Sequence, residues 1–513
     1  MLTHGRMTIY SYLQKQAKKY KDKSFIQYKD EIISYADMLK RSNQTATWLL
    51  KHGIKKGDTV AVMCKNSPFF YDIWFGCAAI GAIMLPINTA STVPELHYLL
   101  EHSDSRGFLF EEALLSDKHL EMAHEFSFSF YQALSAKWRE ECSKLEDCCH
   151  DFHVSHSDVC TIMYTSGTTS KPKGVLITHE NYLYAGHSAI VYQQLTAEDR
   201  YLIFLPLFHV NSQYYTSMAM LVVGGTILLL ERFSASTFWD EVQALRPTTS
   251  SFVATIIKIL LELPPHPYEN NHTIRQIGYG LFVHKDDITR FQERFGVKLF
   301  QWFGMTESVT TNIVTPLYED MPADPKTGIL AIGKPGLGQE VKIVDENAME
   351  VPPHTVGQII IKSPSLMKGY YKNEAETGKT IRDGWLYTGD NGYMNEEGFI
   401  WFVDRGKDVI KRAGENVSSI EIENVLASYP GIVDCAVIGV PDRMREEAII
   451  AYLLTDGTVI SEEELRFFCE EQLSAFKIPQ EFLFVDEFPR TSIGKIQKNI
   501  LRQNYLRAQN PIV

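Results

Sequence analysis

From Thr59 onward, short apolar runs alternate with longer amphipathic stretches through much of the chain. The short runs have the length of buried strands, and the longer stretches repeat their apolar residues at helical spacing. This alternation predicts helices that cover mostly parallel sheets. The predicted strands are Thr59–Met63, Ala82–Ile87, Gly107–Phe110, Tyr201–Leu205, Thr226–Leu230, Ser250–Ala254 and Lys298–Trp302, and the predicted helices are Pro68–Ile80, Val93–His102, His179–Gln193, Ser236–Leu245 and Lys285–Phe295.

Near Glu340 the pattern changes to short apolar runs that glycine and proline separate. These runs predict a small β-rich subdomain at about residues 335–404. A third pattern, of the compact α+β kind, occupies residues 408–513. The elements predicted in these two parts are strands at Val341–Val344, Gln358–Lys362, Phe399–Val403, Val433–Val440 and Ala448–Leu454, and helices at Ser419–Ser428 and Glu462–Gln472.

These patterns predict an α/β protein with two unequal domains, since 513 residues exceed what one core usually organises. The large N-terminal domain, residues 1–404, holds the parallel sheets and the β-rich subdomain. The small, mobile C-terminal domain covers residues 408–513. Between them, the polar segment Asp404–Asp408 has a central glycine, which suits a hinge at residues 405–407; an ordinary surface turn is the alternative.

Charge and composition exclude some functions. The formal net charge is -13, from 63 acidic and 50 basic residues, which argues against a broad nucleic-acid surface. No apolar signal segment opens the chain, and the longest apolar run, Met218–Leu230, is too short to span a bilayer. We therefore expect a cytoplasmic protein without a transmembrane helix. The oligomeric state is left open, with a homodimer as one possibility.

The eight cysteines are scattered, so reduced thiols are expected rather than a disulfide framework. One group is denser: Cys148, Cys149, His150, His153 and His156 fall within nine residues. Adjacent cysteines without paired CxxC spacing fit a tetrahedral metal site poorly. A solvated loop is the favoured interpretation, and a soft-metal site is the alternative.

The most informative segment is TSGTTSKPKG, at Thr165–Gly174. Backbone N–H groups in a glycine-rich turn can converge on phosphate oxygens, hydroxyls add donors, and a lysine adds positive charge. A Walker A loop is excluded because no GK[ST] follows at the required distance. The candidate phosphate-binding residues are Thr165, Ser166, Gly167, Thr168, Thr169 and Lys173. A flexible surface loop is the alternative.

This segment resembles the corresponding loop of the adenylate-forming superfamily of acyl-CoA synthetases, luciferases and adenylation domains, with Ser170 where that family has glycine. Further motifs follow in the family's order: FGMTE at Phe303–Glu307, YTGD at Tyr387–Asp390, VDRGKDVIKRAGENV at Val403–Val417, and RTSIGKI at Arg490–Ile496. The resemblance implies an N-terminal AMP-binding domain at 1–404 and the family's C-terminal domain at 408–513.

The resemblance also implies an activity: ATP-dependent ligation of a carboxylic acid to CoA through an acyl-adenylate, with ATP, Mg²⁺ and CoA bound. Carboxylate attack on the α-phosphate brings two anions together, so positive charge is needed there. Lys495 is similar to the family's adenylation lysine. By the same resemblance, Thr306 contacts the α-phosphate and Glu307 binds the metal, His209 lies between the ATP and acyl sites, and the remaining nucleotide contacts are Gly280, Trp302, Phe303, Asp390 and Arg405.

For the second half-reaction, the family implies that the small domain rotates about Lys407. Lys495 would leave the site, and a face with Lys411, Gly414 and Asn416 would replace it and bind CoA. Glycine at 414 would let CoA approach the backbone more closely than a residue with a Cβ would allow.

The sequence indicates the acid substrate less strongly than it indicates the type of reaction. FHVNSQ at Phe208–Gln213, ERFSASTFWDEV at Glu231–Val242 and RAGENVSSIEIENVL at Arg412–Leu426 look most like the carnitine and crotonobetaine CoA ligases. A trimethylammonium acid needs an aromatic-lined pocket, for which Tyr214, Tyr215, Tyr279 and Trp302 are candidates. A medium- or long-chain fatty acid is the alternative substrate. Acylation of a carrier protein, or a silent nucleotide-binding module, is a more remote alternative.

Overall fold

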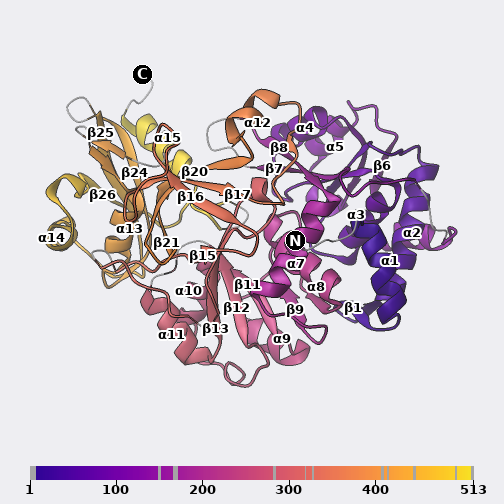
Figure 1. The fold of residues 1–513 in the computed structure, drawn as a ribbon, viewed down its shortest axis with the longest axis horizontal. Coiled ribbons are helices and arrows are strands. Elements are labelled where there is room, and N and C mark those ends of the chain that lie inside the picture. The colour runs from indigo at the N-terminus through magenta and orange to yellow at the C-terminus, as the bar shows by residue number, and fades with distance from the viewer. Residues whose placement is uncertain are drawn as a thin grey trace.

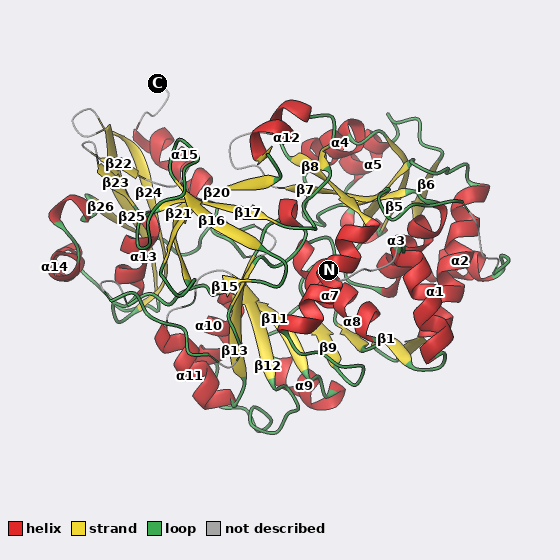
Figure 2. Cartoon of the chain, in the orientation of Figure 1, coloured by secondary structure: helices red, strands yellow, loops and turns green. Residues whose placement is uncertain are grey.

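The computed structural model describes residues 7–147, 152–165, 171–280, 283, 285–317, 319–325, 328–405, 410–412, 415–442, 446–491 and 494–509. Two large sheets with flanking helices form one side of the molecule, and two smaller sheets form the other (Figures 1 and 2). The predicted α/β class, with large and mostly parallel sheets followed by a small α+β part, is confirmed.

The first large sheet has seven strands in the order β18-β8-β7-β4-β3-β5-β6. Strands β4, β3, β5 and β6 run parallel, β4 also pairs parallel with β7, and β7 pairs antiparallel with β8. The strands are β3 (Thr59–Met63), β4 (Ile83–Pro86), β5 (Ser105–Phe110), β6 (Phe130–Ala133), β7 (Val159–Thr165), β8 (Lys173–Thr178) and β18 (Gly369–Tyr370).

The second large sheet has nine strands in the order β15-β14-β13-β12-β11-β9-β10-β1-β2. Its six central strands, from β13 to β1, are parallel, and antiparallel strands close both edges. The strands are β1 (Ser24–Tyr28), β2 (Glu31–Ser34), β9 (Arg200–Ile203), β10 (Thr226–Leu229), β11 (Thr249–Val253), β12 (Gln276–Gly280), β13 (Lys298–Phe303), β14 (Ile313–Val314) and β15 (Lys334–Pro335).

Helices cover both sheets and bury their apolar faces against them. Two helices that the sequence pattern did not assign, α1 and α2, begin at residues whose side chains form capping boxes, Thr8 and Ser34. The helices in this part are α1 (Ile9–Tyr20), α2 (Tyr35–Lys51), α3 (Pro68–Ile80), α4 (Val93–His102), η1 (Glu112–Leu114), α5 (Asp117–Ala123), α6 (Ala136–Ser143), α7 (His179–Tyr192), η2 (Asn211–Ser217), α8 (Met218–Val223), α9 (Phe238–Leu245), α10 (Ala254–Glu262), α11 (Lys285–Phe295) and η3 (Thr306–Ser308).

The two smaller sheets follow in the chain. The first pairs β16-β17-β20-β19, with β21 added beside β20; the second pairs β23-β22-β25-β24, with β26 beside β25. Their elements are β16 (Glu340–Val344), β17 (Gly357–Lys362), α12 (Glu374–Thr380), β19 (Ile381–Arg382), β20 (Trp385–Met394), β21 (Ile400–Arg405), β22 (Ile410–Arg412), β23 (Glu415–Val417), α13 (Ser419–Ala427), β24 (Ile432–Asp442), β25 (Glu446–Thr455), α14 (Glu462–Gln472), η4 (Ala475–Lys477), β26 (Glu481–Phe484) and α15 (Lys498–Gln509).

The structure differs from the predicted arrangement around the glycine-rich segment. Strand β8 separates the Thr165–Gly174 segment from the helix that follows, so this segment connects two antiparallel strands. The predicted domain boundary stays a prediction, because residues 406–409 lie outside the described part. Within the described ranges, no helix is long and apolar enough to cross a bilayer.

A buried ion pair fixes α2 against α3, and it generates the first prediction. Asp72 is fully buried and accepts two hydrogen bonds of 2.8 Å from Arg41. Asp72→Asn should lower the free energy of unfolding by about 3 kcal/mol, because the Arg41 charge then lacks its buried partner. Urea unfolding followed by tryptophan fluorescence measures this.

Glu31, the half-exposed second partner of Arg41, supplies the control. Glu31→Gln should lower the free energy of unfolding by about 1 kcal/mol or less, because water screens an exposed ion pair. Equal losses in the two variants would contradict the assignment of the buried pair as the stabilising one.

Candidate functional site

The predicted site residues gather at one edge of the nine-stranded sheet. Strands β9, β11, β12 and β13 are parallel, so their carboxyl ends meet at the same edge, where open α/β sheets bind ligands. Gly280 ends β12 and Phe303 ends β13, while Thr306 and Glu307 follow in η3. His209 follows β9. These predicted residues therefore come together.

His209 leads into a π-helical turn that the sequence pattern did not reveal. This turn, η2, runs from Asn211 to Ser217 and continues into α8. π-Turns inside helices are often found at functional sites, because the extra residue redirects the side chains. Tyr214 and Tyr215 project from it and are buried, and the Tyr215 hydroxyl donates to the Thr310 carbonyl at 3.4 Å.

Trp302 and Phe303 point to opposite faces of β13, because successive strand residues alternate. The Trp302 ring packs beside Tyr215, with ring centroids 5.3 Å apart, and covers Gly278 so closely that a Cβ there would lie 2.3 Å from the indole. Phe303 instead faces Phe402 of β21, with centroids 6.2 Å apart. The two rings therefore cannot flank the same adenine face. Gly280, with Trp302 Nε1 3.9 Å from its missing Cβ, lies at the same edge.

Glu307 is buried, and a tyrosine orients its carboxylate. Tyr370 of β18 donates a hydrogen bond of 2.8 Å to Glu307 Oε1. The ammonium of Lys173, at the start of β8, lies 4.9 Å from the centre of the Tyr370 ring and 2.7 Å from Glu376. Hydrogen bonds from Lys173 and Lys379 lower the pKa of Glu376 to about 2. The predicted phosphate lysine and the predicted metal ligand are thus joined through Tyr370.

This arrangement suits Mg²⁺ that arrives with ATP. Magnesium is usually held by one or two carboxylates together with substrate phosphates and waters. Among the described residues, no three His, Cys, Asp or Glu side chains cluster as a metal cage. Glu307, buried and oriented by Tyr370, is the candidate carboxylate for such a shared site. Cys148, Cys149 and His150 of the dense Cys/His segment lie outside the described residues, and His156 pairs with Glu180 at 2.7 Å.

Lys495 lies close enough to affect His209, although 286 positions separate them in the sequence. Burial lowers the pKa of His209 to about 4, and the positive charge of Lys495 contributes to the same shift. His209 is therefore neutral near pH 7. Lys495 follows Gly494, whose φ of +79° is accessible mainly to glycine. The last part of the chain thus reaches the edge where the other predicted residues gather.

The remaining predicted residues are only partly described. Asp390 is buried in β20, and the strand register sets it opposite Arg405 of β21. Thr165 pairs with Lys173 at the base of the loop between β7 and β8. Lys411 and Asn416 pair across β22 and β23. Ser166, Gly167, Thr168, Thr169, Lys407 and Gly414 lie outside the described residues.

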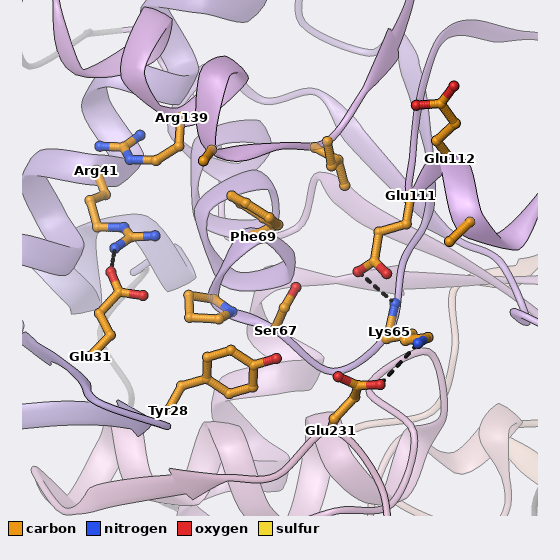
Figure 3. A pocket seen from close by; sticks show the side chains of 14 residues that line it. Tyr28, Glu31, Arg41, Lys65, Ser67, Phe69, Glu111, Glu112, Arg139 and Glu231 are labelled. Atoms are coloured by element: carbon orange, nitrogen blue, oxygen red, sulfur yellow. Dashed lines mark hydrogen bonds and ion pairs between the residues drawn. The ribbon is translucent and has the colours of Figure 1, made fainter.

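A cavity of about 610 Å³ lies apart from these residues and was not expected from the sequence (Figure 3). It is lined where β3 and β5 end, with Ser67 at the start of α3 and Glu111 after β5. Glu111 accepts from the backbone of Lys65 at 3.1 Å, and Lys65 pairs with Glu231 at 2.9 Å. Burial raises the pKa of Glu111. Its lining comes from segments far apart in sequence, so no motif indicates it.

Residues 13–371 match the model of AMP-binding enzymes, and residues 421–495 match that of the AMP-binding enzyme C-terminal domain. The chain belongs to the AMP-binding enzymes. As the sequence predicts, it is an AMP-forming acid:CoA ligase, and ATP, Mg²⁺ and CoA are the small molecules of this class.

Among curated relatives, the chain is similar to the crotonobetaine/carnitine–CoA ligase of Proteus mirabilis strain HI4320, with 37% identity over 488 residues, 92% of this chain and 93% of that one. The corresponding Escherichia coli ligase, from strain ATCC 8739, is 36% identical over 484 residues, 91% of this chain and 92% of that one.

Two solved structures are similar over nearly the whole chain. ATP-bound MatB from Rhodopseudomonas palustris has a TM-score of 0.89 and 27% identity, covering 97% of this chain and 99% of that one. O-succinylbenzoate CoA synthetase from Bacillus subtilis, in complex with ATP and magnesium, has a TM-score of 0.83 and 29% identity, covering 95% and 98%.

The hydrogen bond from Tyr370 to Glu307 generates a second prediction. Tyr370→Phe should raise the Mg²⁺ concentration for half-maximal adenylation about tenfold, because loss of a residue that orients a ligand typically weakens metal binding by that order. The measurement is pyrophosphate exchange against Mg²⁺ at fixed ATP. Tyr371→Phe is the matched control, since its hydroxyl binds Asp104 instead; the same shift in both variants would refute the role of Tyr370.

The proximity of Lys495 to His209 generates a third prediction. Lys495→Gln should raise the pKa of His209 above about 4, because it removes a positive charge that favours the neutral ring. Burial remains, so the pKa should stay below 6.5. NMR titration of the histidine ring signals reports it, and an unchanged His209 pKa would show that the ammonium lies elsewhere in solution.

Proposed function

We propose that this ligase activates a small trimethylammonium acid of the carnitine or crotonobetaine type. The observation that carries the proposal is the 37% identity to a crotonobetaine/carnitine–CoA ligase, which extends over more than nine tenths of both chains. Such coverage supports a shared acid as well as a shared fold.

The aromatic side chains of η2 and β13 support this acid. Tyr214, Tyr215 and Trp302 are buried and lie in edge-to-face or tilted contact, with neighbouring centroids 5.9 and 5.3 Å apart. Aromatic faces attract quaternary ammonium groups, which cannot donate hydrogen bonds. Tyr279 belongs to the separate core beneath α10 and α11, so we leave it out of the proposed pocket.

The residues then have the following proposed roles in adenylation. Lys173 and the loop before it bind the phosphates, Glu307 and the phosphates hold Mg²⁺, and Asp390 accepts from the ribose hydroxyls. Lys495 places its ammonium between the acid carboxylate and the α-phosphate, where two anions must approach. His209, neutral at pH 7, separates the acid from the nucleotide without adding a second positive charge.

The proposal divides the reaction between two positions of the small domain. The described position, in which the charge of Lys495 helps to lower the pKa of His209, serves adenylation. In the second, a rotation about Lys407 withdraws Lys495 and presents Lys411, Gly414 and Asn416 to CoA. A cytoplasmic location is part of this proposal; the six described cysteines are buried and unpaired, as expected of a reducing compartment.

A medium- or long-chain fatty acid is the alternative acid, and carrier-protein acylation the alternative acceptor. The discriminating experiment measures AMP release with ATP, Mg²⁺ and CoA against carnitine, crotonobetaine, γ-butyrobetaine, short acids and fatty acids. Turnover confined to the betaine acids is expected. Preferential turnover of fatty acids would refute the proposed acid and leave the ligase class intact.

The role of Lys495 is tested in the same assay. Lys495→Ala should lower adenylation about 100-fold or more, as when a preorganised transition-state group is removed. The Kd for ATP should stay within about threefold of that of the unsubstituted enzyme, because the phosphates retain their other contacts. Full activity in the variant would contradict the proposed role.

A further inference from the structure

The turn that carries Lys495 is held by an arginine and an aspartate. Arg490 donates to the Gly494 carbonyl at 2.9 Å and to Asp434 Oδ2 at 2.6 Å. Within the turn, Thr491 N–H donates to the Lys495 carbonyl at 2.8 Å, and its hydroxyl accepts from Lys495 N–H at 3.1 Å. Asp434 therefore anchors the base of the turn to β24.

The position of Asp434 is itself set by an irregularity. The pairing of β24 with β25 shifts register between Ile432 and Asp434. Such bulges redirect a side chain from its regular alternation. The Asp434 carboxylate also accepts from the N–H of Cys435 at 2.9 Å, so its orientation is fixed by its own strand as well as by Arg490.

The same aspartate also contacts α10, a helix that packs against the nine-stranded sheet. Lys258, on α10, has its ammonium 3.9 Å from Asp434 Oδ1. Helix α10 begins directly after β11, at the edge where the predicted site residues gather. One turn earlier on α10, Thr255 Oγ1 lies only 3.5 Å from where a Cβ on Gly494 would be. Helix α10 thus contacts both the anchor and the turn.

We propose that Asp434 is a positioning residue for adenylation: it fixes the Lys495 turn through Arg490 and holds that turn against α10 through Lys258. This rests on the proposed role of Lys495. The three side chains are 23 to 31% exposed, so the lysine contact is a modest, salt-sensitive one and the arginine contact the stronger. The arrangement links α10 to the backbone of the turn that carries Lys495.

The experiment separates the two half-reactions. Asp434→Asn, which keeps the shape of the side chain, should lower pyrophosphate exchange about tenfold, because a small misplacement of a reacting group costs rate steeply. Lys258→Gln should lower it about two- to fivefold, as for a partly exposed ion pair. Transfer of the acyl group from a preformed acyl-adenylate to CoA, in a single turnover, should change less than about twofold in both.

Lys285→Gln is the matched control, since Lys285 is an exposed lysine on the neighbouring helix α11. It should leave both half-reactions unchanged. The double variant Lys258→Gln/Asp434→Asn should lose no more than Asp434→Asn alone, because both act through one contact. Equal loss in the two half-reactions, or a loss of exchange no larger than in the control, would overturn the proposal.

A second readout does not need turnover. If Asp434 positions the Lys495 ammonium, Asp434→Asn should raise the pKa of His209 measured by NMR, as Lys495→Gln is expected to do. An unchanged value would refute the positioning role even if exchange fell. If instead Lys495→Ala retains full exchange, the role of Lys495 itself fails, which is a different outcome from failure of the Asp434 variants.

Discussion

The repulsion between two anions is the constraint on which this structure depends. A carboxylate and a triphosphate must approach to bonding distance, and this requires positive charge between them. The chain divides the charges between distant parts. Lys173 lies at the start of β8 and pairs with Glu376, and Lys495 lies near the end of the chain on a separate turn.

About half of the regular elements were predicted from the sequence, namely those whose burial leaves a plain apolar pattern. Each predicted strand and helix from Thr59 to Gln472 is present, with ends displaced by no more than two residues. Helices α1 and α2 were not assigned, because their buried positions include polar residues such as Gln16, Asn43 and Gln44, which weaken the apolar periodicity. Strand β8 was missed because it begins inside the glycine-rich motif.

The sequence motifs predicted which residues belong to the candidate site, but not how these residues are arranged in space. Motifs indicated Glu307 and Lys173 separately, but the tyrosine between them comes from β18, nearly 200 residues after Lys173. The π-turn after His209 is a one-residue excess in a helix, which no periodicity reveals. Asp434 carries no motif at all; its place follows from a bulge and from the docking of α10.

The alternation of Trp302 and Phe303 along β13 has a consequence for how such an enzyme can diversify. Trp302 faces Tyr215 of the proposed acid pocket, and Phe303 faces Phe402 of the β-rich subdomain. Two neighbouring residues therefore contact two different parts of the structure. Under the proposed roles, a substitution at position 302 changes the wall of the acid pocket and leaves the contact between Phe303 and Phe402 in place.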